Sequence, residues 1–223
     1  MGLSVAASIW GVAVLLYALF IAWWVNWRGP LTAREIDACL ARIEAGGGDT
    51  GGADLRAFLE KDDGRQFVML NLVRLPSEPV ADPFTGERMP APALLRRYTS
   101  RFQRVLLANG GLAYWFARKA GPYLDSWDTR PGPDPALIAD PGWSAVGMMR
   151  YRSRRDMLKL ASDPAFIAAH PYKIAAMPLT ISFPTQPLMT LAVQPPVTVA
   201  LVLALAAALV HLGISAATGQ AVI

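Results

Sequence analysis

The two ends of the chain are unbroken runs of apolar residues, and all charged residues lie between them. Every Lys, Arg, Asp and Glu falls between Arg28 and Lys173. Residues 3–25 and residues 197–217 are each long enough to cross a hydrocarbon core of roughly 30 Å as a helix. The pattern therefore predicts two membrane-spanning helices that flank a charged central part.

A cleaved signal peptide is the alternative interpretation of the first apolar run, and its flanks argue against it. No basic residues precede the run, its apolar stretch is too long, and no small-residue cleavage site follows it. Trp23, Trp24 and Trp27 precede Arg28, which is typical of an aromatic belt with a cationic stop at the membrane surface. Neither end carries a competing Lys or Arg. The positive-inside rule therefore predicts a two-pass protein of a bacterial inner membrane, with a cytoplasmic central part and external termini.

The segment 28–65 has the pattern of two short helices. Thr32 and Glu35 have the spacing of a capping box, and a second helix is expected at 53–60 after a glycine-rich stretch. The apolar residues that follow the box at helical spacing are Ile36, Cys39, Leu40 and Ile43. We interpret this segment as a helical connector between the N-terminal span, residues 1–27, and the domain that follows.

Residues 66–190 have the pattern of an α+β domain with the element order β-α-β-β-α-β. Apolar runs bounded by turn residues predict strands, and an apolar stripe with helical period predicts a helix that ends at a Gly-Gly pair. The predicted strands are 66–75, 112–120, 143–151 and 178–184, and the first helix is about 93–109. A proline-rich loop at 121–142 is long enough to suggest a binding arm. Residues 191–223 hold the second span and a short tail.

The stretch "RYRSRRDMLKLASDPAFIAAHP", residues 150–171, combines four arginines with a lysine and a histidine. Ser153 is expected to cap a helix, and the apolar stripe of that helix leaves Arg154, Arg155 and Lys159 on solvated faces. Asp163 with the proline that follows it restarts the helix. We favour a well-capped helix start, and the alternative is an anion-binding site formed by Ser153, Arg154 and Arg155.

The rest of the composition excludes several function classes. Seventeen acids are interleaved with twenty-one basic residues, so a net charge of +4 favours anionic lipid headgroups rather than a nucleic acid as the basic surface's partner. The single Cys39 forms no internal disulfide. No Gly-rich phosphate loop, paired cysteine motif or nucleophile elbow occurs. We predict no metal site, because the aspartates of the proline-rich loop match no calcium loop and suit turns; they are Asp125, Asp128, Asp134 and Asp140.

Three features together resemble the dimeric α/β-barrel superfamily. They are the strand "FVMLNLVRL", the helix that carries Tyr98 and ends in "GG", and the later "VGMMRYRSRRDMLKLASDPAF" followed by a final strand. The chain is most similar to a small bacterial family described as a domain of unknown function, over about residues 66–185. The resemblance implies a ferredoxin-like β-α-β-β-α-β domain whose sheet pairs with another sheet. The residues expected to supply one or the other sheet face are Met69, Asn71, Tyr114, Phe116, Met148 and Arg150.

The superfamily includes cofactor-free monooxygenases, isomerases and haem-handling enzymes, and the last group holds iron through a histidine on a helix. His170 is the one histidine of this domain, on an apolar stripe. The resemblance therefore makes His170 a candidate haem ligand. A packed, hydrogen-bonded core residue is the favoured interpretation.

The second apolar run contains a histidine at membrane depth, where an ionisable group usually faces protein, a cavity or a cofactor. "ALVLALAAALVHLGISAAT" resembles the membrane helix of light-harvesting α polypeptides, in which a small residue four positions before a histidine makes room for bacteriochlorophyll. Ala207 and His211 hold those positions. The resemblance implies a bacteriochlorophyll or haem at His211, and the favoured alternative is a histidine hydrogen-bonded to a neighbouring helix or headgroup.

Two functions fit these features. We expect an accessory or scaffold subunit of a larger integral-membrane complex, of photosynthetic or respiratory type, because two spans accompany no catalytic constellation. Its partners would be membrane lipids and other integral-membrane subunits or a second copy of itself. The alternative is a membrane-tethered enzyme of the dimeric α/β-barrel type, monooxygenase-like or haem-handling-like, acting on a small apolar metabolite.

Overall fold

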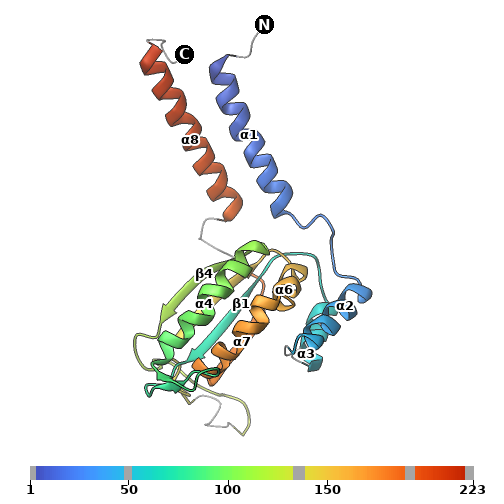
Figure 1. The fold of residues 1–223 in the computed structure, drawn as a ribbon, viewed down its shortest axis with the longest axis vertical. Coiled ribbons are helices and arrows are strands. Elements are labelled where there is room, and N and C mark those ends of the chain that lie inside the picture. Colours follow the sequence, from blue (N-terminus) through green and yellow to red (C-terminus); the bar gives the residue numbers. More distant parts are fainter. Residues whose placement is uncertain (1–3, 48–51, 133–138, 189–193, 219–223) are drawn as a thin grey trace. The chain divides into compact units, whose positions relative to one another are not determined.

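The structure is a computed structural model that describes residues 4–47, 52–132, 139–188 and 194–218 (Figure 1). The chain divides into two compact units. One contains both ends of the chain, Met1–Trp27 and Leu188–Ile223, and the other is the central domain, Arg28–Pro187.

The unit with the chain ends is a pair of apolar helices, α1 (Val5–Trp24) and α8 (Pro195–Thr218). Each is long and apolar enough to cross a membrane, so both predicted spans are candidate spans in the structure as well. The two helices pack against each other. Ala207 is the residue of α8 that this packing buries.

The central domain is built on one antiparallel sheet of four strands with the order β4-β5-β1-β6. The strands are β1 (Phe67–Arg74), β4 (Gly111–Arg118), β5 (Ala145–Tyr151) and β6 (Leu179–Thr185). All four predicted strands are present, with ends shifted by a few residues. The proline-rich segment after β1 adds a short hairpin of β2 (Val80–Ala81) and β3 (Arg88–Met89).

Two helices, α4 (Ala91–Ala108) and α7 (Pro164–Ala176), pack together over one face of the sheet (Figure 1). The predicted stripe of α4 is confirmed, because Leu94, Tyr98 and Phe102 are buried there. Gly110 ends this helix with a φ of 72°, a backbone conformation that residues with a Cβ rarely adopt. The short helix α6 (Arg154–Ala161) precedes α7.

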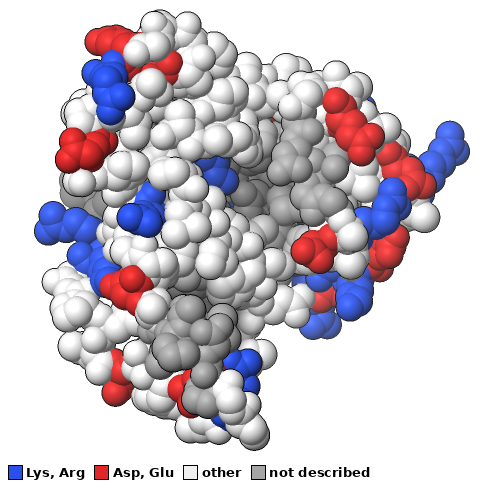
Figure 2. Space-filling model, turned by 90° about the horizontal axis from the view of Figure 1, so that it is seen from below, with Lys and Arg blue, Asp and Glu red and all other residues white. Residues whose placement is uncertain are grey.

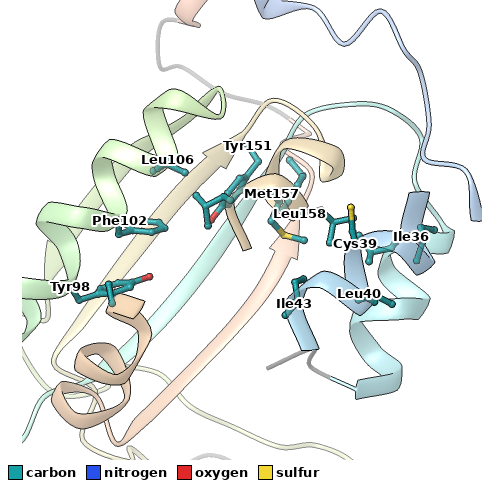
Figure 3. Packing of buried hydrophobic residues seen from close by; sticks show 14 residues of the cluster. Ile36, Cys39, Leu40, Ile43, Tyr98, Phe102, Leu106, Tyr151, Met157 and Leu158 are labelled. Carbon is teal, nitrogen blue, oxygen red and sulfur yellow. The ribbon is translucent and has the colours of Figure 1, made fainter. Parts of the chain in front are cut away.

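The helices α2 (Ala33–Ala45) and α3 (Gly52–Glu60) belong to the central domain by packing. The capping box predicted at the start of α2 is present. Its four buried apolar residues join one hydrophobic cluster with Phe67 and Tyr151 of the sheet. Figure 3 shows this cluster, with the α2 side chains beside Leu158 and Met157. The segment expected to be a connector thus also contributes to the core.

The two faces of the sheet differ, and strand register assigns residues to each. Met69 pairs with Met149 and Asn71 with Gly147 on the face that lines the space under the helices. The residues between them point the other way. Cross-strand neighbours there form two apolar rows: Trp115, Met148, Leu70 and Phe183 in one, and Ala117, Val146, Leu72 and Ile181 in the other.

Candidate functional site

The arginines before α7 were expected to be solvated, and this prediction is wrong. Arg154 and Arg155 are only 8% and 6% exposed. Arg155 donates to Glu35 (3.1 Å) and to the backbone carbonyls of Gly29 (2.9 Å) and Pro30 (3.0 Å). The apolar stripe of α6 identifies one buried face of the helix. The prediction failed because α2 and the chain before it cover the opposite face as well.

Arg154 is held by the end of α3. Its Nη1 donates to the Phe58 carbonyl (2.5 Å), and its guanidinium lies 4.2 Å from the centroid of the Phe58 ring. Its Nε has no hydrogen bond and faces Asp62 Oδ1 at 3.6 Å. Arg154 and Arg155 therefore join α6 to the N-terminal helices of the domain.

Ser153 caps α6 as predicted, with its hydroxyl accepting from the Asp156 amide (3.2 Å). The same hydroxyl donates to Asp156 Oδ2 (2.8 Å), which also accepts from Arg152 Nε (2.8 Å). The carboxylate of Asp156 thus occupies the start of α6, the position at which the alternative interpretation placed a bound anion. The proposed anion-binding donors, Ser153, Arg154 and Arg155, are brought together, and each contacts groups of this chain.

Beneath α4 and α7 lies a cavity of about 340 Å³. Its floor is the helix-covered face of the sheet. Its apolar end is formed by Met69, Met149, Phe102, Met157 and Leu160, and its polar end by Asn71, Thr180, Ser182 and Lys173. A concave apolar site with a few converging polar groups is the usual form of a small-molecule site.

Two tyrosines present hydroxyls to this cavity. Tyr98 and Tyr151 are 6% and 7% exposed, and both line the cavity. Neither hydroxyl makes a hydrogen bond to any described residue. Burial raises the pKa of both phenols above the ordinary value, so both are neutral donors. Figure 3 shows Tyr98 directed from α4 over the sheet toward Tyr151.

Lys173 of α7 also lines the cavity and is partly buried. No described residue forms a hydrogen bond or ion pair with its ammonium group. Burial lowers the pKa of Lys173 below its ordinary value, because the charged form loses water without gaining a counter-ion. Within the described part of the domain, the lysine is a cation without a partner beside an apolar cavity.

His170 lies on the cavity wall one turn before Lys173. Its ring meets the Phe166 ring edge-on, with centroids 5.5 Å apart. Phe166 in turn packs against Tyr98 and Phe102. The contact with Phe166 agrees with the interpretation of His170 as a packed residue, and the haem-ligand role is not tested by it.

His211 of α8 accepts a hydrogen bond at Nδ1 from Trp10 Nε1 of α1 (3.3 Å). A neutral imidazole that accepts at Nδ1 carries its proton on Nε2, so this arrangement offers no second lone pair for a central metal. Ala207, one turn earlier, is buried in the unit. The hydrogen bond between α1 and α8 agrees with the alternative favoured from the sequence, a histidine bonded to a neighbouring helix. His211 could serve as an axial ligand of a bacteriochlorophyll or haem only if the Trp10 side chain turned away.

The second feature of the domain is the sheet face opposite α4 and α7, which no described helix of the domain covers. Trp115 (49% exposed), Phe183 (44%) and Ile181 (48%) belong to the two apolar rows of that face. Of the residues expected to supply a face, Met69, Asn71 and Phe116 lie on the cavity side, whereas Met148 and Arg150 face outward. The Arg150 guanidinium lies over the Tyr114 ring, 5.9 Å from its centroid.

The loop after β4 contributes a wider hollow of about 660 Å³. Residues 118–127 line it together with Trp115 and Val146 of the uncovered face. Asp128 pairs with Arg130 and Asp140 with Lys119, and Asp134 lies outside the described residues. Among the described residues, no group of three or more potential ligands is placed to hold a metal ion.

Charged residues are not gathered into one patch on the face drawn in Figure 2, where Lys and Arg are interspersed with Asp and Glu. The sites that stand out are therefore the cavity and the uncovered sheet face. Sequence patterns missed Lys173 and Tyr151 as site residues. The signal available for Lys173 was a single cation in an otherwise apolar helix that carries a histidine three positions earlier.

The residues thus describe a mixed α+β domain in a chain with two candidate membrane spans. No protein-family model matches the chain, and no curated protein matches it. Two crystal structures of RPA0582, a protein of unknown function from Rhodopseudomonas palustris, resemble it at 22% identity and a TM-score of 0.49. One match covers 64% of this chain and 97% of that chain, and the other, to methylated RPA0582, covers 65% and 96%.

Proposed function

We propose that the protein is an accessory or scaffold subunit of a larger integral-membrane complex, docking through the central domain. The observation that carries this proposal is the uncovered sheet face. Its two rows named above are apolar on all four strands, whereas the adjoining row contains Arg150. Trp115 and Phe183 are exposed in the apolar rows. A contiguous exposed apolar patch of this kind marks an interaction site.

The domain is proposed to have the ferredoxin-like fold of the dimeric α/β-barrel type. Numbered along the chain as first to fourth, the sheet strands lie in the order second-third-first-fourth. One helical segment, α4, follows the first strand, and another, α6 with α7, follows the third. This order supports the fold, and the open face is the one that such domains cover by pairing with a second sheet.

We propose a similar apolar sheet on another subunit as the occupant of this face. A twisted antiparallel sheet is well covered by a second sheet packed at about 10 Å, and the two rows here are apolar without interruption. The candidate spans, α1 and α8, would anchor the subunit in a bacterial inner membrane. Arg28 and the later cations favour a cytoplasmic domain and external termini.

Purification from native membranes in mild detergent, followed by mass spectrometry, tests this function. We expect stoichiometric copurification with other membrane subunits. Trp115→Glu should weaken the association by at least roughly thirtyfold, as loss of a central aromatic anchor costs about 2 kcal/mol. Leu107→Glu is the matched control, because Leu107 is 55% exposed on α4, which covers the other face. Purification as a lone protein, or equal effects of the two variants, would contradict the proposal.

The cavity favours a second candidate, a membrane-tethered enzyme acting on a small apolar metabolite. Lys173, Tyr98 and Tyr151 bring one cation and two neutral donors to one apolar space. Partly buried groups with shifted pKa values in a cavity are candidates for catalysis. Incubation with candidate metabolites and product analysis, comparing the wild type with Lys173→Met, tests this reading.

A bacteriochlorophyll or haem at His211 remains a prediction that requires loss of the Trp10 bond. We expect Trp10→Phe to favour such a ligand, and His211→Leu to remove any pigment or haem band from the purified complex. A colourless complex in both variants and in the wild type would assign His211 to helix packing alone.

A further inference from the structure

The cavity under α4 and α7 has one feature that distinguishes it from ordinary packing: three of its polar groups, Lys173 and the hydroxyls of Tyr98 and Tyr151, have no hydrogen-bond partner among the described residues. The described part of the domain contains ten ion pairs, and none of them involves Lys173. The hydroxyls of Tyr98 and Tyr151 make no hydrogen bond to described residues either. A largely apolar cavity with a few polar groups that converge on it and have hydrogen-bonding capacity to spare is the usual form of a small-molecule site, so these three groups point to something the cavity binds.

The cavity is also polarised from end to end. Along β1 its floor runs from Val73 through Asn71 to Met69. Thr180 and Ser182 pair with Val73 and Asn71, so the polar floor lies at the Val73 end. The opposite end has Met69 paired with Met149.

Lys173 lies at the polar end. Its neighbours on α7, Tyr172 and Ala176, pack in the small hydrophobic cluster that contains Val73. Asn71 and Ser182 are already engaged, since Ser182 donates to Asn71 Oδ1 (2.7 Å) and Asn71 donates to two backbone carbonyls. The ammonium of Lys173 is therefore the group at this end with donors to spare.

We infer that this cavity binds an apolar monocarboxylate, with the carboxylate paired to Lys173 and the apolar body against Met69, Met149 and Phe102. A single cation balances a single negative charge, whereas a phosphate dianion would need more donors than the described lining offers. The Tyr98 hydroxyl, on the wall between the two ends, donates to the ligand's polar portion. The volume of about 340 Å³ suits an aromatic or medium-chain acid.

Charge pairing predicts how binding depends on pH. The pKa of Lys173 is lowered in the free protein, and a bound carboxylate raises it, because an opposite charge favours the ammonium form. Binding is therefore accompanied by proton uptake when the free lysine is partly neutral. Affinity should fall as the pH rises through the pKa of the free lysine.

The test is calorimetric titration of the full chain in lipid nanodiscs, with empty nanodiscs as the blank. The probes are phenylbutyrate, neutral phenylbutanol and cationic phenylbutylamine. Phenylbutyrate should bind most tightly, and Lys173→Met should weaken it by roughly ten- to hundredfold, the range expected for a hydrogen bond to a charged group. Lys173→Arg should restore part of the affinity. Lys61→Met is the matched control, because Lys61 is exposed and lines none of the described cavities.

Equal affinity of the wild type for phenylbutyrate and phenylbutanol would overturn the inference, as would undiminished binding by Lys173→Met or no binding of phenylbutyrate at all. The pH series on the wild type is independent of whether the variants fold, and affinity that is constant or rises with pH also overturns it. The inference concerns the same cavity as the second candidate function, but it requires only binding and no reaction. Tight binding of phenylbutyrate without turnover would support the binding site and contradict the enzyme function.

Discussion

Two regions of the domain concentrate polar side chains in buried positions, and they differ in how those side chains are paired. At α6, Arg155 reaches Glu35 and two backbone carbonyls, and Asp156 accepts from Ser153 and Arg152. In the cavity, neither the tyrosine hydroxyls nor the Lys173 ammonium have a partner among described residues.

The difference separates architecture from a binding site. The buried charges at α6 are paired, apart from the Nε atom of Arg154, and such pairs hold elements together. Polar groups that are left unpaired beside an apolar cavity cost stability in the free protein. A bound ligand that supplies the missing hydrogen-bond partners offsets this cost, so unpaired polar groups in a cavity indicate a binding site.

The largest effect should come from breaking the paired region. Arg155→Met removes the buried donor to Glu35 and to two carbonyls, while Glu35 keeps its bonds from Arg28 and Thr32. It should lower the free energy of unfolding by about 1.5–3 kcal/mol, the range for hydrogen bonds to a charged group. Chemical denaturation measures the change.

The control for this variant is Arg28→Met. Arg28 pairs with the same carboxylate, but its side chain is 68% exposed, so its loss should cost about 0–1 kcal/mol. Similar costs for the two variants would show that burial of Arg155 contributes little.

The second effect is the acid sensitivity of the paired region. The hydrogen bond from Arg155 and the backbone amide of Thr32 lower the pKa of Glu35 from 4.5 to about 2. The folded state binds its proton more weakly than the unfolded state, so the stabilisation is complete above about pH 4.5 and is lost as the pH falls toward 2. Glu35→Gln should remove this part of the acid dependence, measured by denaturation across that window. A wild-type and variant difference that stays constant with pH would refute the assignment.

The smallest effect on stability should come from the unpaired region. Lys173→Met and Tyr98→Phe remove polar groups without partners, so each should change the free energy of unfolding by no more than about 0.5–1 kcal/mol, with stabilisation the expected direction. The pKa of Lys173 is lowered on folding, so the unfolded state binds more protons and wild-type stability should rise as the pH approaches 10.5. Lys173→Met should abolish that rise. A large loss of stability would mean that these groups are structural.

The sequence by itself determined the local features. Uncharged runs located both candidate spans, and the four strands and the caps at Thr32, Ser153 and Asp163 are where the patterns put them. These features depend on residues within a few positions of each other, through backbone hydrogen bonds and the periodicity of apolar side chains.

Only the tertiary structure decided which polar residues are buried and which are paired. Glu35 lies 120 positions before Arg155, and Trp10 lies 201 positions before His211, so neither contact has a local signal. The same holds for Lys173, whose cavity is closed by strands and by a helix from elsewhere in the chain. Helical periodicity assigns a residue to a face of its own helix, but burial and pairing depend on what other elements bring to that face.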